Sequence, residues 1–587
     1  MRIASHYVAL ALAVAAGCSS SKPISNAQPN TRIANAIDLG SVSPDSTYDF
    51  IVGIESQNQP LLHKFLDQQQ LTGDSLGPDD FADRFSVSAA EYLRVASWLR
   101  AHDMTITRLV KGRNTISVHA TAAAIESAFG AQLHNFSDAQ GKFTASIEGL
   151  TISSEVSGSI SGFAGGFDGS PDWFSHMRRA IGSTRGNTGV HSNAIPTATG
   201  MDGSFRAAEL ETLYGTSALT MPGKGQTVVI LGAVAPPQTA DINEYFTTSK
   251  PYGLTAVPAG SYMQDLVGGP ALEPDGGEGD ENTLDADMVL AFAPYASVKH
   301  VITATSGAGF FLDGIAHIVD TYTGGTNQAI AVTVSYGSCE RGSSSEMPVL
   351  NAMLAQAKAA GQTWFFAAGD AGTDGCRNGP GNTIVSAGWP ASSPYVVGVG
   401  GTDILKTPTT TPITGEQVWN ENDNKDGEYF GVTFGGAGGG GVSEVQAKPA
   451  FQTGVGPGAG DSSRDEPDVS ALGGSPGVEI FVTPQGQAQA AEPIAGTSAA
   501  TPMWAGMWAL IAQAKGLTSI TNGLEQIYAL GKADQTLTTG QSFNDITIGN
   551  NGGPGDEPTG GYPAGKGYDL ATGWGTPNVP AIIANWK

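Results

Sequence analysis

The sequence predicts an α/β protein whose larger part is a doubly wound, mostly parallel sheet, preceded by a smaller α+β unit. Beyond residue 205, short and almost entirely apolar runs alternate with helical patterns. Such runs are typical of strands that are buried on both faces of a parallel sheet. Between about residues 45 and 165, two amphipathic helices are flanked by short strands, which indicates two helices against a sheet in a ferredoxin-like unit.

The strands of the larger part are predicted at five apolar runs. Helical stretches between them include NTLDADMVLAFA and MPVLNAMLAQAKAAG. In a doubly wound sheet, functional groups collect at the carboxyl ends of the strands, and Asp370 ends one of these runs. The runs are QTVVILGAV (226–234), SVKHVITAT (297–305), QAIAVTVSYG (328–337), QTWFFAAGD (362–370) and YVVGVGG (395–401).

The N-terminus has the features of an export signal, predicted over residues 1–18. Arg2 precedes a short apolar stretch and a region of small residues. The segment Ala-Ala-Gly-Cys18 also resembles a lipoprotein processing site, so the protein is expected to be exported, either secreted or anchored to a membrane through Cys18. Residues 19–44 are rich in Ser, Asn and Pro and are predicted to be a tether.

The charge of the chain excludes two classes of partner. Asp and Glu outnumber Lys and Arg by 55 to 29, which gives a formal charge of -26. Nucleic acids and anionic membrane surfaces bind basic faces, so neither is expected as a partner. An acidic protein would carry less charge at low pH, which suits an exported enzyme working there.

Ser498 is the candidate nucleophile. It lies in the turn GTSA of EPIAGTSAATPMW, directly before an apolar run that reads as a buried helix. A serine hydroxyl is a weak nucleophile until a base takes its proton, and that base is most often histidine. Beyond residue 205, the only histidines are His300, in a predicted strand, and His317, in a predicted amphipathic helix. Both are expected to be structural, so the sequence disfavours a Ser-His-Asp triad.

A pair of carboxylates offers another base. Glu281 and Asp285 are four residues apart in EGDENTLDADMVLAFAP, so a helix places their Cβ atoms about 5–6 Å apart on one face. Two carboxyls that close cannot both ionise easily, so one pKa rises and the pair shares a proton. Such a pair can act as an acid/base unit at acidic pH. From this stretch alone, an acidic helix start stabilised by the helix dipole remains the alternative.

The order of three motifs resembles one peptidase family. The Glu-x-x-x-Asp helix, the strand ending in Asp370 and the turn around Ser498 follow one another as in the sedolisin, or serine-carboxyl peptidase, family of subtilisin-like α/β enzymes active in acid. The resemblance extends from about residue 45 to the C-terminus. GPDDFADRFSVSAAEYLRVASWLRAHDM and AIESAFGAQLHNF are similar to the family's activation prodomain. Further matching segments are WPASSPYVVGVGGT (389–402), GGGGVSEVQAKPAFQ (438–452), RDEPDVSAL (464–472), FNDITIGNNG and GYDLATGWGTPN.

The resemblance implies a role for four catalytic residues. Ser498 would attack the peptide carbonyl, and Glu281, oriented by Asp285, would accept its proton and later deliver it to the leaving amine. Asp370 would stay protonated and, with the Ser498 backbone N–H, would stabilise the oxyanion. Because ionised Asp370 cannot donate that hydrogen bond, an acidic optimum is expected.

The resemblance also implies one structural calcium ion. Asp545 and Ile546 in FNDIT, with Gly565, Gly567 and Asp569 in AGKGYD, match the family's calcium loop. Two carboxylates and backbone carbonyls supply hard oxygen ligands, and glycines let the chain fold tightly around the ion. Without the resemblance, the stretch reads as an ordinary turn-rich loop.

Cysteine usage indicates a disulfide. Once Cys18 is removed or lipidated, Cys339 and Cys376 remain as an even pair in an oxidising compartment, with two buried thiols as the alternative. VSYGSCE (334–340) resembles the segment that lines the primary specificity pocket. The resemblance implies that the disulfide ties this segment to the loop after Asp370, which reads GDAGTDGC where the family commonly has Gly-Asp-Ser-Gly.

The sequence therefore predicts an acid endopeptidase made as a zymogen. Residues 45–165 would be the prodomain and intramolecular inhibitor, 166–204 a connector containing the processing site, and 205–587 the catalytic domain. Protein or peptide substrates are the expected partners, and a monomer is expected. Two alternatives remain: a tripeptidyl exopeptidase of the same family, and a non-catalytic surface binding protein that keeps the fold.

Overall fold

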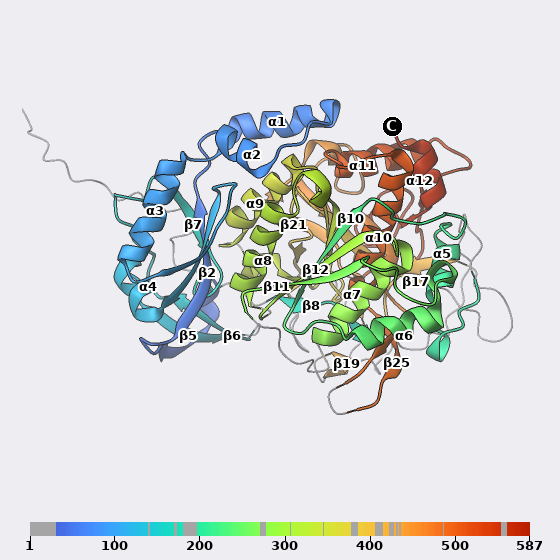
Figure 1. Ribbon diagram of the computed structural model, residues 1–587, viewed down its shortest axis with the longest axis horizontal. Helices are drawn as coiled ribbons and strands as arrows, with labels where there is room; N and C mark the ends of the chain where they lie inside the picture. Colours follow the sequence, from blue (N-terminus) through green and yellow to red (C-terminus); the bar gives the residue numbers. More distant parts are fainter. Residues whose placement is uncertain are drawn as a thin grey trace, which may run out of the picture.

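In the computed structural model, a smaller N-terminal lobe lies beside a larger C-terminal lobe (Figure 1). The predicted export signal (1–18) and the first part of the predicted tether lie outside the described residues. Within the described ranges, no helix combines the length and the apolar composition needed to cross a bilayer. The structure describes residues 31–587 apart from 139–140, 170–172, 180–195, 270–277, 306, 344, 377–384, 405–414, 422–427, 430–431, 434–435, 485–486 and 553–559.

The larger lobe is built on an eight-stranded sheet with the order β11-β12-β10-β13-β15-β17-β18, in which β23 also pairs with β17. Neighbouring strands are parallel except β17 and β18, which are antiparallel. The predicted mostly parallel sheet is therefore confirmed. The strands are β10 (Thr227–Ala233), β11 (Tyr262–Val267), β12 (Ser297–Thr303), β13 (Ala329–Val334), β15 (Thr363–Ala367), β17 (Val397–Ile404), β18 (Glu416–Val418) and β23 (Val469–Leu472).

Strand β10 shows why these strands read as unbroken apolar runs. Val228 and Ile230 pack in one core with α5, α6, α7, α10, α11 and α12, whereas Val229 and Leu231 pack in a second core with α8 and α9. Both faces of the sheet are covered by helices, so the positions from Val228 to Leu231 are all apolar. The helices are α5 (Ala207–Leu213), α6 (Thr239–Ser249), α7 (Glu278–Phe292), α8 (Ala308–Thr321), α9 (Met347–Ala359), α10 (Thr497–Lys515), α11 (Gly523–Asp534) and α12 (Val579–Asn585).

The smaller lobe contains an antiparallel sheet with the order β3-β4-β2-β7, which shares an apolar core with α3 and α4. Along the chain the elements follow a β-α-β-β-α-β order, which is the predicted ferredoxin-like arrangement. Residues such as Phe50, Leu99 and Ile125 form the core between sheet and helices. The elements are β2 (Thr47–Ile54), α3 (Ala89–Ala101), β3 (Thr105–Leu109), β4 (Thr115–Thr121), α4 (Ala122–Phe129) and β7 (Ile160–Ala164).

The smaller lobe begins before residue 45, where the sequence placed its start. Strand β1 (Ile37–Ser41) pairs with β5 (Leu133–Asp138), which pairs with β6 (Gly141–Ser146), so part of the predicted tether belongs to this lobe. The side chains of β1 are mostly exposed, and its backbone pairing holds it in place. No buried apolar run therefore marks the strand in the sequence.

The smaller lobe is held against α8 and α9 by apolar and ionic contacts (Figure 1). Ile51 of β2 packs in the same cluster as Phe311 of α8. Arg108 of β3 donates from Nε and Nη2 to the carboxylate of Asp313 on α8, at 2.8 and 3.1 Å. Helices α1 (Gln59–Thr72) and α2 (Pro78–Phe85) pack against α9.

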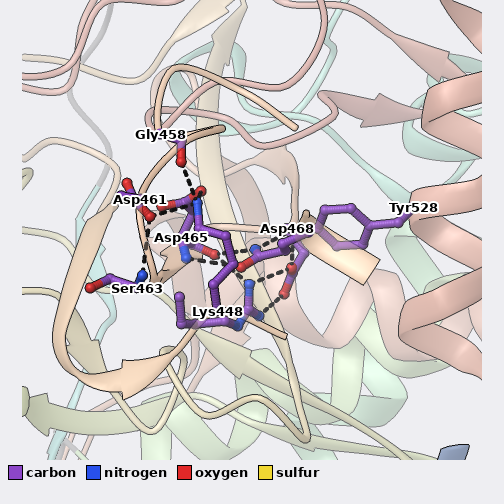
Figure 2. Close-up of polar contacts among 9 residues, drawn as sticks. Lys448, Gly458, Asp461, Ser463, Asp465, Asp468 and Tyr528 are labelled. Atoms are coloured by element: carbon purple, nitrogen blue, oxygen red, sulfur yellow. Dashed lines mark hydrogen bonds and ion pairs between the residues drawn. The ribbon is translucent and has the colours of Figure 1, made fainter. Parts of the chain in front are cut away.

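A buried ionic cluster fixes the segment RDEPDVSAL beside the sheet. Arg464 is fully buried and donates from both terminal nitrogens to Asp468, at 2.9 and 2.6 Å. The hydroxyl of Tyr528, on α11, donates to the same carboxylate at 2.7 Å (Figure 2). Lys448 and its carboxylate partner Asp465 lie next to this group. One carboxylate thus joins the strand segment to helix α11.

Candidate active site

Ser498 lies at the start of helix α10, shortly after strand β25 (Ala490–Ala495), and is fully buried. Gly496 makes the turn between them with φ of 123°, a conformation that strains L side chains. A Cβ added to Gly496 would lie 2.0 Å from the carbonyl oxygen of His176 and 3.1 Å from Oδ2 of Asp370. The glycine therefore lets both oxygens approach the turn that carries the serine.

The structure brings the two carboxylates of α7 to this serine. The Ser498 hydroxyl donates to Oε2 of Glu281 at 3.1 Å and also lies 3.3 Å from the carbonyl oxygen of Ser335. Asp285 accepts a hydrogen bond of 2.6 Å from the hydroxyl of Ser335. Both carboxyl groups are fully buried, and burial raises the pKa of Asp285 well above its usual range. The neutral form of Asp285 is therefore favoured at acidic pH.

Ser335 is a site residue that the sequence analysis did not single out. It connects β13 to β14 (Tyr336–Cys339), and its hydroxyl joins Asp285 while its carbonyl faces the Ser498 hydroxyl. The only signal in the sequence is its position at the carboxyl end of a buried strand, where functional groups are expected.

Asp370, which follows β15, faces the same turn. Its Oδ1 accepts from the backbone N–H and from the hydroxyl of Thr497, at 2.8 and 2.9 Å. Because both groups donate to it, Oδ1 acts as an acceptor. Oδ2 is the carboxylate oxygen that would lie 3.1 Å from a Cβ added to Gly496. The four residues predicted to be catalytic thus gather around one turn.

Neither histidine beyond residue 205 is a hydrogen-bond partner of Ser498. His300 is fully buried against the hydroxyl of Tyr262, and burial lowers its pKa to about 3. His317 lies on α8, where its Nε2 is 2.7 Å from a carboxylate oxygen of Asp265. Both contacts are structural, as the sequence predicts.

A third histidine reaches the site through its backbone. His176 belongs to the connector predicted over residues 166–204, and only 4% of it is exposed. Its carbonyl oxygen accepts a hydrogen bond of 3.3 Å from the Ser498 backbone N–H, and its own N–H donates to the carbonyl of Ser335 at 3.1 Å. The sequence analysis missed this residue because the connector is rich in Gly, Ser and Asn and shows no strand pattern.

A disulfide joins Cys339 to Cys376, as predicted. Cys339 ends β14, the strand that starts beside Ser335, and Cys376 lies in the loop after Asp370. The bond thus connects two segments that border the site.

The predicted calcium loop is a separate feature of the larger lobe. Asp545 accepts from the backbone N–H of Gly567, and Asp569 accepts from that of Gly565, both at 2.9 Å. Oδ1 of Asp545 is buried without a hydrogen-bond partner among the described residues. Ile546 is buried beside this loop. A buried carboxylate, Asp569, and a half-buried one, Asp545, which has an unbonded buried oxygen, meet at a glycine-rich loop and fit a hard divalent cation.

Comparisons with known proteins cover both lobes. Residues 34–167 match the pro-kumamolisin activation domain, and residues 279–530 match the subtilase family. The chain is 27% identical to sedolisin from Pseudomonas sp. (strain 101), over 86% of this chain and 80% of that protein. It is also 27% identical to kumamolisin from Bacillus sp. (strain MN-32), over 92% of each chain.

A solved structure resembles about two thirds of this chain. It is Pseudomonas sedolisin, described as a serine-carboxyl proteinase complexed with two molecules of pseudo-iodotyrostatin. The two structures align with a TM-score of 0.53 and 27% identity, over 66% of this chain and 98% of that chain.

Proposed function

Because this chain belongs to the sedolisin family of serine-carboxyl peptidases and carries an activation domain, we propose that it is an acid-active endopeptidase that matures from a zymogen. It hydrolyses protein and peptide substrates through an acyl-enzyme on Ser498. The observation that carries this proposal is the 3.1 Å hydrogen bond from the Ser498 hydroxyl to Glu281. No imidazole takes that place among the described residues.

The proposed mechanism assigns proton transfer to the two carboxyl groups of α7. Glu281 takes the Ser498 proton as the hydroxyl attacks a peptide carbonyl, and then delivers it to the leaving amine. Asp285, held by the Ser335 hydroxyl, orients Glu281 and stays neutral because it is buried. A neutral Asp285 leaves the pair with a single negative charge, which makes Glu281 available as a base.

We propose that Asp370 stabilises the oxyanion of the tetrahedral intermediate. Thr497 occupies its Oδ1, so a proton on Oδ2 can be donated toward the developing negative charge together with the Ser498 backbone N–H. Losing one such donor typically costs ~3 kcal/mol in the transition state. An ionised Asp370 also repels the oxyanion, so activity falls as the pH rises toward neutrality.

The course of the connector supports an endopeptidase. Its residues 173–179 pass along the site, pairing with β14 on one side of Ser498 and with β25 on the other. His176 contacts the Ser498 backbone N–H, and Trp173, three residues before it, is still buried against Phe311. More than three residues of the connector therefore lie along the site before Ser498 is passed. A tripeptidyl exopeptidase requires a cleft that closes after three residues.

We propose that one calcium ion is held by the carboxylates of Asp545 and Asp569 and by backbone oxygens of Ile546, Gly565 and Gly567. The ion would supply positive charge to these two carboxylates and stabilise the loop without taking part in catalysis.

We further propose that the protein is exported and monomeric. Two outcomes distinguish the forms of export. Release of the mature enzyme into the medium would support secretion. Partition into a detergent phase, abolished by Cys18→Ala, would support a lipid anchor. Size measurement by light scattering tests the monomer.

The proposed function is tested with purified precursor that has been acidified to about pH 4, where an ordinary carboxyl is half ionised. We expect hydrolysis of denatured casein at internal bonds, and none by Ser498→Ala. Release of tripeptides alone would instead indicate an exopeptidase, and absence of hydrolysis across the acidic range would refute the function.

A further inference from the structure

The connector passes through the active site as an extended chain. Strand β8 (Phe174–Ser175) pairs antiparallel with β14, and β9 (Arg178–Arg179) pairs antiparallel with β25, the strand that leads to Ser498. Only His176 and Met177 lie between these two pairings. The chain is therefore fixed on both sides of the point at which it passes the nucleophile.

His176 makes the two backbone contacts that a substrate residue needs at this point. Its N–H donates to the carbonyl of Ser335 at 3.1 Å, which sets the position of the residue along β14. Its carbonyl oxygen accepts from the Ser498 backbone N–H at 3.3 Å. That N–H is the oxyanion donor, and an oxyanion donor points at the carbonyl that is attacked.

We propose that the bond between His176 and Met177 is the one that Ser498 cleaves when the precursor matures. This inference rests on the proposed function. The Ser498 oxygen would bond to the His176 carbonyl carbon while its proton passes to Glu281. The carbon–nitrogen bond to Met177 then breaks, and Glu281 gives that proton to the Met177 nitrogen. Water hydrolyses the ester, which leaves a carboxylate on His176 and an amine on Met177.

The side chain of His176 is buried beside two glycines, Gly337 and Gly369. A Cβ added to Gly337 would lie 2.9 Å from Nε2 of the imidazole and 2.8 Å from the carbonyl oxygen of Trp389. A Cβ added to Gly369 would lie 3.8 Å from the imidazole Cε1. The imidazole therefore needs the missing side chain of Gly337 on β14, whereas a side chain at Gly369 would make only ordinary contact with it.

Residues before His176 fill further positions of the cleft. The ring of Phe174 packs edge-on against the imidazole, with ring centroids 5.1 Å apart. Trp173 stacks on Phe311 at 5.2 Å and donates from Nε1 to Glu346 at 3.2 Å. Aromatic residues at the third and fourth positions before the cleaved bond, Phe174 and Trp173, thus anchor the chain in register.

Mapping the ends of the fragments tests the bond directly. Precursor is acidified to about pH 4 and sampled over time, and each fragment is identified by intact mass and N-terminal sequencing. We expect the first large fragment to begin at Met177 and the first small one to end at His176. A first cut elsewhere in the chain, with the His176–Met177 bond intact, would overturn the inference.

Two proline variants sharpen the test. Met177→Pro places a ring carbon where the leaving nitrogen carries its hydrogen, so the fragment beginning at position 177 should be lost. Ser183→Pro introduces the same residue in the connector outside the described segment, and this control should release the wild-type fragment at the wild-type rate. Loss of the fragment in both variants, or in neither, would contradict the assignment.

A casein assay on the same samples separates this inference from the proposed function. Hydrolysis of casein with the connector cut at another bond refutes the processing site and leaves the peptidase function standing. Absence of both casein hydrolysis and connector cleavage refutes both.

Discussion

The hydroxyl of Ser498 donates a hydrogen bond of 3.1 Å to Oε2 of Glu281, and both side chains are fully buried. A carboxylate is a weaker base than imidazole, because its usual pKa is about 4.3 against about 6.5. Burial raises the pKa of the neighbouring Asp285, so at acidic pH the pair carries at most one negative charge. We therefore expect a reaction that depends on this pairing to run at acidic pH.

The stability of the precursor should fall as the pH rises. Glu346 is fully buried, and burial raises its pKa to about 8. A carboxyl whose pKa is raised by folding stabilises the native state below its unfolded pKa and loses that contribution as the pH rises toward the folded value. We therefore expect the unfolding free energy of Ser498→Ala precursor to fall between about pH 4.5 and 8. Adding Glu346→Gln should make this fall shallower by about 1.4 kcal/mol per pH unit.

Urea unfolding at a series of pH values measures this slope. Glu148→Gln, which changes an exposed glutamate, is the matched control and should leave the slope unaltered. An equal slope in wild type and Glu346→Gln would show that Glu346 is ionised in the native state.

Removing Asp468 should destabilise the larger lobe strongly. Arg464 is fully buried and relies on this carboxylate, so Asp468→Ala leaves a buried charge without its partner. The expected loss is about 3–5 kcal/mol of unfolding free energy. The exposed pair of Arg341 and Glu444 offers the comparison, and Glu444→Ala should cost less than about 1 kcal/mol. Similar losses in the two variants would argue against a structural role for the buried cluster.

Removing calcium should lower the melting temperature, and this response should require Asp545. EDTA should destabilise the wild-type enzyme, because an ion present at 100 times its dissociation constant contributes about 2.7 kcal/mol. Asp545→Asn should melt earlier without EDTA and respond little to it, whereas the exposed control Asp74→Asn should respond like wild type. Added calcium should restore wild-type melting. A wild-type protein indifferent to EDTA would count against the ion.

Weakening the contact between the lobes should speed activation. Asp313 accepts from Nε and Nη2 of Arg108 and from the hydroxyl of Ser117, so three donors of the smaller lobe converge on one carboxylate. Asp313→Asn removes the negative charge and should let the precursor mature faster and at higher pH. Asp83→Asn, which alters an ion pair within the smaller lobe, serves as control. Identical time courses in all three proteins would exclude this contact as a restraint on activation.

The fold could be predicted largely because burial leaves a local mark. Strand β10 faces two cores, so its residues from Val228 to Leu231 had to be apolar. The spacing of Glu281 and Asp285 likewise placed both on one helix face. His176 and Ser335 left no such mark, because they reach the site through backbone groups and a single hydroxyl. Strand β1 was missed for a related reason, since its pairing needs no apolar side chains.

The most direct test of the carboxylate base is the kcat/KM of Glu281→Gln at about pH 4, since general acid–base catalysis contributes roughly 10²- to 10⁴-fold. The variant can be matured by an unrelated peptidase at a cleavage site engineered into the connector, with circular dichroism to verify its fold. His317→Gln is the control. We predict a loss of at least about 100-fold for Glu281→Gln and near wild-type activity for His317→Gln. Wild-type activity in a folded Glu281→Gln enzyme would contradict the carboxylate base.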